Sequence, residues 1–261
     1  MKRILIDRPP DGLPEEFRGL VCDARIYDSS CSPQARVYYI DRDGGYYLKS
    51  AAHGSLRTEA EMDRYFFGKG LGAEVLGYVS GDKDWLLTAR VKGEDCTYGE
   101  YLASPARLCD ILAERLRMLH ELDCSDCPVP DRVDTYLTTA ELNYRTGNFD
   151  RSQFPDSFGY KSADEAYDAL QNGKSALKSN VLIHGDYCLP NIVLDNWRFS
   201  GFIDLGNGGV GDRHIDIFWA VWTLWFNLKT DKYTDRFFDV YGRDKIENHV
   251  LKTVAAAEVF G

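Results

Sequence analysis

Three oxygen-bearing side chains in the last third of the 261-residue chain have the types and the spacing needed for phosphoryl transfer. Asp186 and Asn191 belong to the segment HGDYCLPN, residues 184–191, and Asp204 opens the segment DLG, residues 204–206. Short apolar runs around them indicate strands at 181–183, 192–194 and 199–203. Because the three side chains lie at the ends of consecutive short strands, we expect them to converge on one point.

This set of side chains suits magnesium chemistry, because Mg²⁺ prefers oxygen ligands and takes only one or two carboxylates from the protein. Asn191 and Asp204 are the predicted metal ligands. Asp186 is then predicted to orient the attacking hydroxyl and accept its proton, as the catalytic-loop aspartate does in protein kinases. The order H-x-D-x(4)-N followed by D-x-G matches the kinase pattern. Ordinary turn residues are the alternative, which explains an isolated HGD better than this two-part motif.

The glycine between His184 and Asp186 distinguishes the motif from that of protein kinases. The segments HGDYCLPN and FIDLGNGG resemble those of the aminoglycoside phosphotransferases, most of all the aminoglycoside 3′-phosphotransferase branch. The resemblance implies an α+β, two-lobed, protein-kinase-like fold. A small β-rich N-terminal lobe over residues 1–90 is expected to bind the nucleotide. A larger, mainly helical lobe over residues 91–261 is expected to carry catalysis and substrate binding.

The resemblance also assigns a nucleotide site that uses ATP, with GTP as an alternative. Lys49, in the strand YYLK, is expected to pair with the α- and β-phosphates, whereas a lone strand lysine would indicate only a solvated charge. A helix at 56–69 is expected to carry its partner Glu59, with Glu61 as the alternative. Tyr47 is expected to lie against adenine. The full set of residues assigned to the nucleotide is Ser32, Tyr47, Lys49, Glu59, Ala89, Val91 and Ile203.

Two residues are expected to support the catalytic loop. Asp216 lies in the apolar stretch HIDIFWAVWTLWFNL, residues 214–228, which is too short to span a membrane and fits a buried helix. A buried aspartate needs partners. By analogy with kinases, Asp216 should hold the loop backbone near His184.

The resemblance places acceptor binding at Asp156, Glu258 and Phe260. Glu258 stands near the end of the final helix, where the helix dipole adds negative charge and favours a cationic amine. An exposed glutamate at a frayed terminus is the alternative. The chain departs from its relatives at Asn207, where arginine is usual, and at Ala257, which replaces an acid.

Composition limits the choice of partner and compartment. The formal charge of −10 argues against nucleic acid and suits a polycationic substrate. Seven scattered cysteines and the absence of an apolar leader in MKRILIDRPP indicate free thiols in a cytoplasmic protein, without a membrane span. Zinc at Cys124, Cys127 and His120 is disfavoured because a second ligand pair is missing. A monomer or weak dimer is expected.

The remaining elements follow from periodicity and turn residues. Strands are predicted at 4–6, 21–27, 37–40, 46–49, 75–79 and 85–89, with a hairpin turn at 41–45 and a linker at 90–94. A helix capped by Ser104 should begin at Pro105. Further helices are predicted at 134–145, 163–178, 214–228, 233–241 and 244–260.

The predicted protein is an ATP- and Mg²⁺-dependent phosphotransferase that acts on a hydroxyl of aminoglycoside antibiotics, with the 3′-hydroxyl expected and resistance as the consequence. A kinase for another small hydroxylated metabolite, such as an amino sugar, a choline-like or a homoserine-like compound, is the first alternative. A nucleotide-binding protein without catalysis is the second, and the complete set of Lys49, Asp186, Asn191 and Asp204 disfavours it.

Overall fold

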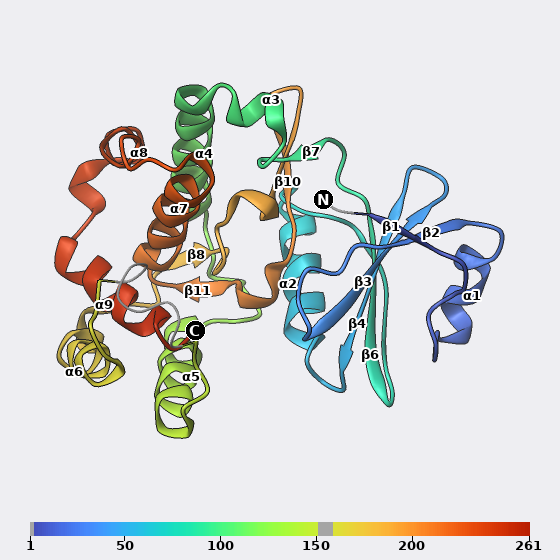
Figure 1. The fold of residues 1–261 in the computed structure, drawn as a ribbon, viewed down its shortest axis with the longest axis horizontal. Helices are drawn as coiled ribbons and strands as arrows, with labels where there is room; N and C mark the ends of the chain where they lie inside the picture. Colours follow the sequence, from blue (N-terminus) through green and yellow to red (C-terminus); the bar gives the residue numbers. More distant parts are fainter. Residues whose placement is uncertain (1–2, 151–158) are drawn as a thin grey trace. The chain divides into compact units, whose positions relative to one another are not determined.

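The computed structural model describes residues 3–150 and 159–261 (Figure 1). Backbone contacts divide the chain into two compact units. The first unit holds Met1–Cys96 together with Pro190–Gly206, and the second holds Thr97–Leu189 and Asn207–Gly261. The first unit therefore contains a segment from late in the chain, which a single boundary near residue 90 does not assign to it.

A six-stranded antiparallel sheet forms the body of the first unit (Figure 1). In spatial order its strands are β1 (Ile4–Ile6), β2 (Arg25–Asp28), β3 (Ala35–Asp41), β4 (Tyr46–Ala52), β6 (Lys83–Ala89) and β5 (Val75–Ser80). The predicted hairpin at 41–45 joins β3 to β4, where Gly44 and Gly45 take φ values of +97° and +101°. Glycine adopts such angles without a steric penalty, so the register of β4, which carries Lys49, is fixed at this turn.

Two helices accompany this sheet, α1 (Glu15–Val21) and α2 (Arg57–Gly68). The prediction of a strand over 21–27 is wrong in its first part, because Val21 ends α1 and β2 starts only at Arg25. Phe17 and Val21 lie one helical turn apart and are both buried in the core under the sheet, with Ile40, Leu48 and Leu87. The helix at 56–69 is confirmed by α2.

A three-stranded sheet completes the first unit, with the order β10 (Arg198–Phe202), β9 (Ile192–Asp195) and β7 (Glu94–Asp95). The segment 90–94 was predicted to be a linker, but its end pairs with β9 as β7. Gly93 makes this close pairing fit, because a Cβ there would lie 2.2 Å from the carbonyl oxygen of Leu194.

The second unit is mainly helical and carries a short antiparallel pair, β8 (Val181–Ile183) with β11 (Gly209–Gly211). Its helices are α3 (Gly99–Leu102), α4 (Pro105–His120), α5 (Arg132–Thr146), α6 (Ala163–Gly173), α7 (Arg213–Leu228), α8 (Thr234–Tyr241) and α9 (Asn248–Glu258). Figure 1 shows α4 and α7 side by side, and the two helices are in contact. The predicted mixture of a β-rich first part and a mainly helical remainder is confirmed.

Two of the predicted helices differ from the structure at their ends. Pro105 begins α4 as predicted, but the Ser104 side chain makes no capping hydrogen bond. The helix predicted to reach residue 178 ends at Gly173 and continues as a single 3₁₀ turn.

All seven cysteines are free. Within the described ranges, no helix has the length and hydropathy needed to cross a bilayer.

Candidate active site

The first unit brings one lysine and two acids together. The Nζ atom of Lys49 on β4 donates to both carboxylate oxygens of Glu59 on α2 at 2.8 Å, and to Oδ1 of Asp204 at 2.7 Å. Burial opposes the charge of Lys49, but the two carboxylates outweigh it and raise the pKa of the lysine. Lys49 therefore stays charged, and the predicted ion pair with Glu59 rather than Glu61 is confirmed.

The hairpin of β9 and β10 places Asn191 beside Asp204. Ile192 pairs with Phe202 across the hairpin, and the N–H of Ile203 donates to the carbonyl oxygen of Asn191 at 3.0 Å. Asp204 itself takes a left-handed φ of +63°, which is uncommon outside glycine but accessible to aspartate. Asn191 is buried, whereas half of the Asp204 side chain is exposed.

The donor set at this position fits a hard divalent cation. Asn191 offers an amide oxygen and Asp204 a carboxylate, and the ammonium group of Lys49 already compensates that carboxylate. Among the described residues, no group of three or more His, Cys, Asp and Glu could form an all-protein metal cage. A magnesium ion usually takes one or two protein carboxylates and completes its shell with water and phosphate oxygens. These residues therefore fit Mg²⁺.

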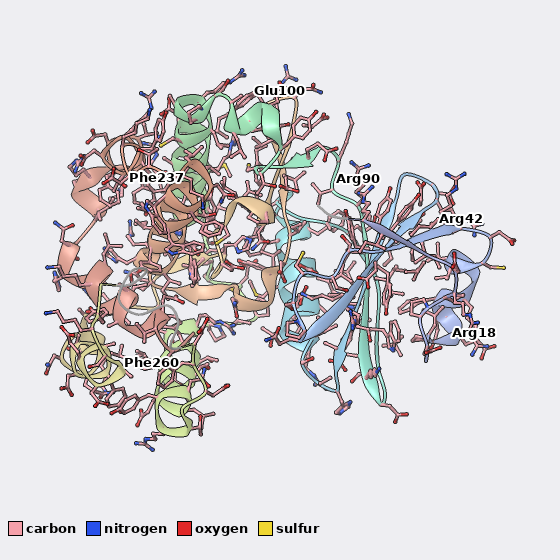
Figure 2. All side chains as sticks on the ribbon, viewed as in Figure 1. Arg18, Arg42, Arg90, Glu100, Phe237 and Phe260 are labelled. Carbon is pink, nitrogen blue, oxygen red and sulfur yellow. The ribbon has the colours of Figure 1, made fainter. Side chains whose placement is uncertain are left out.

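A pocket of about 190 Å³ in the first unit gathers three of the predicted nucleotide residues, Tyr47, Val91 and Ile203. The other residues that line it are Arg3, Arg90, Gly93, Glu94, Asp95 and Val193. Arg90, labelled in Figure 2, donates to the carbonyl oxygen of Gly93 at 3.0 Å. Arg3 and Arg90 were not predicted, because an arginine outside any motif gives no sequence signal of a pocket.

Two further predicted nucleotide residues lie outside the residues that line this pocket. The N–H of Ala89 donates to the carbonyl oxygen of Glu74 at 2.9 Å, so Ala89 can offer a nucleotide only its carbonyl oxygen. Ser32 is exposed in the loop before β3. Ser30 closes that loop, since its hydroxyl accepts from the N–H of Val37 at 2.9 Å.

The loop that carries the predicted base Asp186 follows β8 in the second unit and is held by α7. The carboxylate of Asp216 accepts from the N–H groups of His184 and Gly185, at 2.8 and 2.7 Å, which confirms the predicted support. Gly185 has a φ of +82°, and a Cβ there would lie 2.0 Å from the carbonyl oxygen of Asn207. The HGD motif therefore needs its glycine. The N–H of Asp186, the predicted base, donates to Nδ1 of His184 at 3.3 Å. This hydrogen bond fixes the backbone at Asp186.

His120 has a structural role beneath this loop. Its Nε2 lies 3.1 Å from Oδ2 of Asp216, and its Nδ1 lies 2.8 Å from the hydroxyl of Tyr241. Burial lowers the pKa of His120, although the Asp216 carboxylate opposes this effect, so the ring is neutral. A carboxylate can only accept, and Nε2 therefore carries the proton that is donated to Asp216. Both ring nitrogens are occupied, which leaves His120 unsuited to a metal.

A second anchor from α7 was not predicted. Thr223, two helical turns after Asp216, accepts from the N–H of Leu189 at 3.2 Å. The hydroxyl of Tyr187 donates to the carbonyl oxygen of Leu112 at 2.9 Å, inside the core. A threonine in an apolar helix gives little sequence signal, although its seven-residue distance from Asp216 places both on one helix face.

Glu258 lies buried in the second unit. The hydroxyl of Tyr136 and the Nε1–H of Trp219 both donate to its Oε1, at 2.8 and 3.0 Å. Burial raises the pKa of Glu258, the two donors lower it, and the nearby charge of Asp186 raises it, so that the resulting pKa is about 7. The alternative of an exposed glutamate at a frayed terminus is wrong, because the apolar face of α9 packs into the core.

The other acceptor residues differ in how they are placed. Phe260 is fully buried between α5 and α6 (Figure 2), and its ring centroid lies 5.4 Å from that of Tyr144. Asp156 lies outside the described residues. The side-chain oxygen of Asn207 accepts from Nη2 of Arg132, the first residue of α5, at 2.8 Å.

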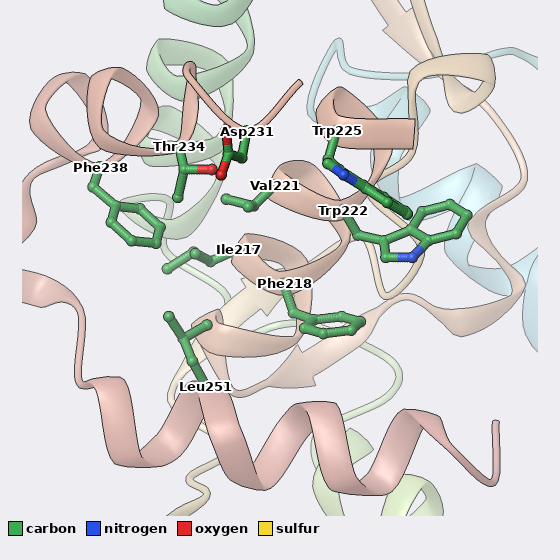
Figure 3. Close-up of a pocket in the computed structure, with 9 residues that line it drawn as sticks. All are labelled: Ile217, Phe218, Val221, Trp222, Trp225, Asp231, Thr234, Phe238 and Leu251. Carbon is green, nitrogen blue, oxygen red and sulfur yellow. The ribbon is translucent and has the colours of Figure 1, made fainter. Parts of the chain in front are cut away.

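A largely apolar pocket of about 270 Å³ lies among α7, α8 and α9 (Figure 3). The residues that line it are Ile217, Phe218, Val221, Trp222, Trp225, Asp231, Thr234, Phe238 and Leu251. None of the predicted site residues in the described part of the chain belongs to this set.

Comparison with known proteins gives a consistent result. The model of the phosphotransferase enzyme family matches residues 30–250. The chain is 50% identical over 249 residues to a probable aminoglycoside 3′-phosphotransferase of Lactococcus lactis, covering 95% of each chain. It is 31% identical over 200 residues to the aminoglycoside 3′-phosphotransferase of Niallia circulans, covering 76% of each.

Solved structures share the fold. The crystal structure of a type VIII aminoglycoside 3′-phosphotransferase superimposes with a TM-score of 0.80 at 23% identity, covering 94% of this chain and 97% of the other. A Streptomyces rimosus aminoglycoside phosphotransferase in complex with ADP and streptomycin gives a TM-score of 0.71 at 22% identity, covering 86% and 90%. The predicted kinase-like fold is thereby confirmed.

Proposed function

The chain belongs to the phosphotransferase enzyme family, and we propose that it transfers the γ-phosphoryl group of ATP to the 3′-hydroxyl of aminoglycoside antibiotics and so confers resistance. The observation that carries the proposal is the shared ion pairing of Lys49 with Glu59 and Asp204. A charged lysine held by a helix glutamate, next to a metal-binding aspartate, is the arrangement used for phosphoryl transfer.

The first unit supplies the nucleotide site in this proposal. Lys49, oriented by Glu59, binds the α- and β-phosphates. Tyr47 and Ile203 enclose the adenine ring in the 190 Å³ pocket, and the backbone of Ala89 and Val91 hydrogen-bonds its edge. Ser32 contributes to the loop that covers the phosphates. Together these residues position the γ-phosphoryl group. They contribute to the rate by holding the reactants in place and by stabilising the charge that develops in the transition state.

Asn191 and Asp204 would hold Mg²⁺. When bound, the ion neutralises the charge that develops on the transferred phosphoryl group. Lys49 orients the carboxylate of Asp204, since its Nζ atom donates to Oδ1 of Asp204 at 2.7 Å. The amide of Asn191 is kept beside Asp204 by the β9–β10 pairing. The protein thus contributes a preformed pair of oxygen ligands.

Asp186 acts as the general base. Its carboxylate orients the acceptor hydroxyl and takes its proton as the hydroxyl oxygen bonds to the γ-phosphorus atom, while the bond from that atom to the β–γ bridging oxygen breaks and ADP leaves. His184 and Asp216 hold the loop backbone, so that the carboxylate is aimed by the fold. Glu258, Phe260 and Asp156 are the proposed acceptor residues, and Glu258 offers its charge to an ammonium group of the antibiotic.

A kinase for another small hydroxylated metabolite is the second candidate. The observation that favours it is the burial of Glu258, which limits the carboxylate area offered to a polycation. ADP release measured across aminoglycosides, amino sugars, choline and homoserine separates the two candidates. Turnover with aminoglycosides that lack only the 3′-hydroxyl would exclude that hydroxyl as the acceptor. ADP release with none of the aminoglycosides, but with another compound, would overturn the proposal.

Asp186→Asn tests the mechanism within the same assay. The loss of the base should lower kcat by about 100- to 10,000-fold, while the KM for ATP stays nearly constant. Asp164→Asn, an exposed carboxylate on α6, is the matched control. Wild-type turnover in Asp186→Asn would remove this carboxylate from the mechanism.

A further inference from the structure

Three tyrosines form a ladder across the large sheet of the first unit. Tyr27 on β2 pairs in register with Tyr39 on β3, and Tyr39 pairs with Tyr47 on β4. Ring centroids are 6.1 Å apart between Tyr27 and Tyr39 and 5.3 Å apart between Tyr39 and Tyr47. The last member of this tyrosine ladder, Tyr47, lines the 190 Å³ pocket.

Arg3, just before β1, joins the tyrosine ladder at its pocket end. Its Cζ lies 3.5 Å from the ring centroid of Tyr39, and its Nη2 donates to the hydroxyl of Tyr47 at 3.0 Å. Arg3 also lines the pocket itself. A guanidinium is planar, so one side chain can stack on a ring and donate from its edge at the same time. An ammonium group could not do both.

We propose that Arg3 is a nucleotide-positioning residue that fixes the Tyr47 ring as the surface for the nucleoside half of the nucleotide. The inference rests on the proposed function, because it takes the pocket to be the nucleoside site. Arg3 lies outside residues 30–250, which the family model matches. Holding a binding surface in place before the ligand arrives reduces the ordering cost of binding.

The contact with the nucleoside half predicts a specific pattern of affinities. Arg3→Ala should lower the affinities for adenosine and for ADP by the same factor, about three- to tenfold, because the contact of Arg3 involves neither phosphate nor metal. Lys49→Ala should weaken ADP and leave adenosine nearly unchanged. Tyr47→Phe keeps the ring but removes the oxygen that accepts from Arg3, and should reproduce part of the loss. Combined with Arg3→Ala, it should add little, since both changes remove one contact.

The experiment is calorimetric titration of the wild type and variants with adenosine and with ADP, together with kcat and KM values. Arg8→Ala, an exposed arginine shortly after β1, is the matched control and should bind like the wild type. Arg3→Lys keeps the charge but removes the planar guanidinium, and it should behave like Arg3→Ala. A general structural defect would also change the KM for the acceptor, which should stay constant here.

Two results would overturn the inference: unchanged adenosine affinity in folded Arg3→Ala, whether or not ADP affinity falls, or fully multiplicative effects of Arg3→Ala and Tyr47→Phe. Wild-type protein that binds neither ligand would contradict the proposed function as well, and this is seen before any variant is compared. Wild-type binding with an unaffected Arg3→Ala variant contradicts only the role of Arg3.

Discussion

Glu59 on helix α2 presents both of its carboxylate oxygens, at 2.8 Å, to Lys49 on strand β4, which lies ten residues earlier in the chain. Lys49 is also bonded to Asp204, so the two acids compete for one ammonium group. Without Glu59, the lysine should move fully onto Asp204, away from the position proposed for the phosphates and at the expense of the proposed metal ligand. In the proposed site, the pairing thus keeps Lys49 available to a nucleotide.

We therefore expect Glu59→Ala to lower kcat/KM for ATP by at least about tenfold, or about 1.4 kcal/mol of transition-state stabilisation. Glu61→Ala, an exposed glutamate two residues further along the same helix, should behave like the wild type. Steady-state kinetics with varied ATP measure both. Equal losses in the two variants would show that the effect comes from the helix and not from the ion pair.

Asp204→Asn should raise the Mg²⁺ concentration that the enzyme needs for activity. The substitution keeps the side-chain shape but removes the charge, and a hard cation loses its only charged ligand in the proposed set. The Mg²⁺ concentration for half-maximal rate should rise on the order of tenfold or more. Asp195→Asn, whose carboxylate pairs with Lys92 at 2.8 Å on the same hairpin, is the control. An unchanged magnesium dependence would contradict the assignment.

Asp216→Asn should destabilise the second unit and slow the reaction together. The carboxylate accepts two backbone N–H groups and the Nε2–H of His120, whereas an amide offers only one accepting oxygen. The free energy of unfolding should fall by about 3 kcal/mol, because buried donors lose their partner. Urea denaturation measures this loss, with the exposed Asp244→Asn as control. A stable variant with full activity would rule out this support for the loop.

The buried carboxyl group of Glu258 should make stability depend on pH. Its pKa in the folded state is about 7, above the ordinary value of 4.5, so between these values the folded protein binds more protons than the unfolded chain. The free energy of unfolding should therefore fall as the pH rises from 4.5 to about 7. The shift corresponds to roughly 3 kcal/mol at most. Glu258→Gln should flatten this part of the curve, and parallel curves would contradict the assignment.

The ionisation of Glu258 should also make the KM for the acceptor depend on pH. An ammonium group is attracted by the ionised form of Glu258, so the KM for the aminoglycoside should fall as the pH rises through about 7. The KM for ATP should not follow this trend. High salt should change the effect little, because salt screens buried charges much less than exposed ones. Glu258→Gln should remove the pH dependence of the acceptor KM, and its persistence would place the amine elsewhere.

The parts of the site that the sequence predicted are those whose geometry is local. Asn191 and Asp204 meet because a short hairpin joins them, and the strands of that hairpin are visible as apolar runs. Glu59 could be chosen over Glu61 by counting along one helix. Asp216 could be predicted because a charge in an apolar helix must find partners.

The rest depends on contacts between elements distant in sequence. Arg3 reaches Tyr47 across 44 residues, and Tyr136 reaches Glu258 across 122, with no motif to mark either pair. The strand β7 is two residues long, too short to show any periodicity. Its pairing with β9 decides which unit the segment belongs to, and this depends on tertiary structure alone.

The assignment of Pro190–Gly206 to the first unit limits how homologous genes for such a protein can recombine. A crossover between genes at residue 96 would bring a foreign hairpin to the parental sheet, so β7 would have to pair with a β9 that evolved beside another partner. The proposed metal-binding residues would then come from one parent and Lys49 from the other. Exchange of the first unit as a whole therefore needs two further crossovers, near residues 190 and 206, and recombination should rarely exchange that unit intact.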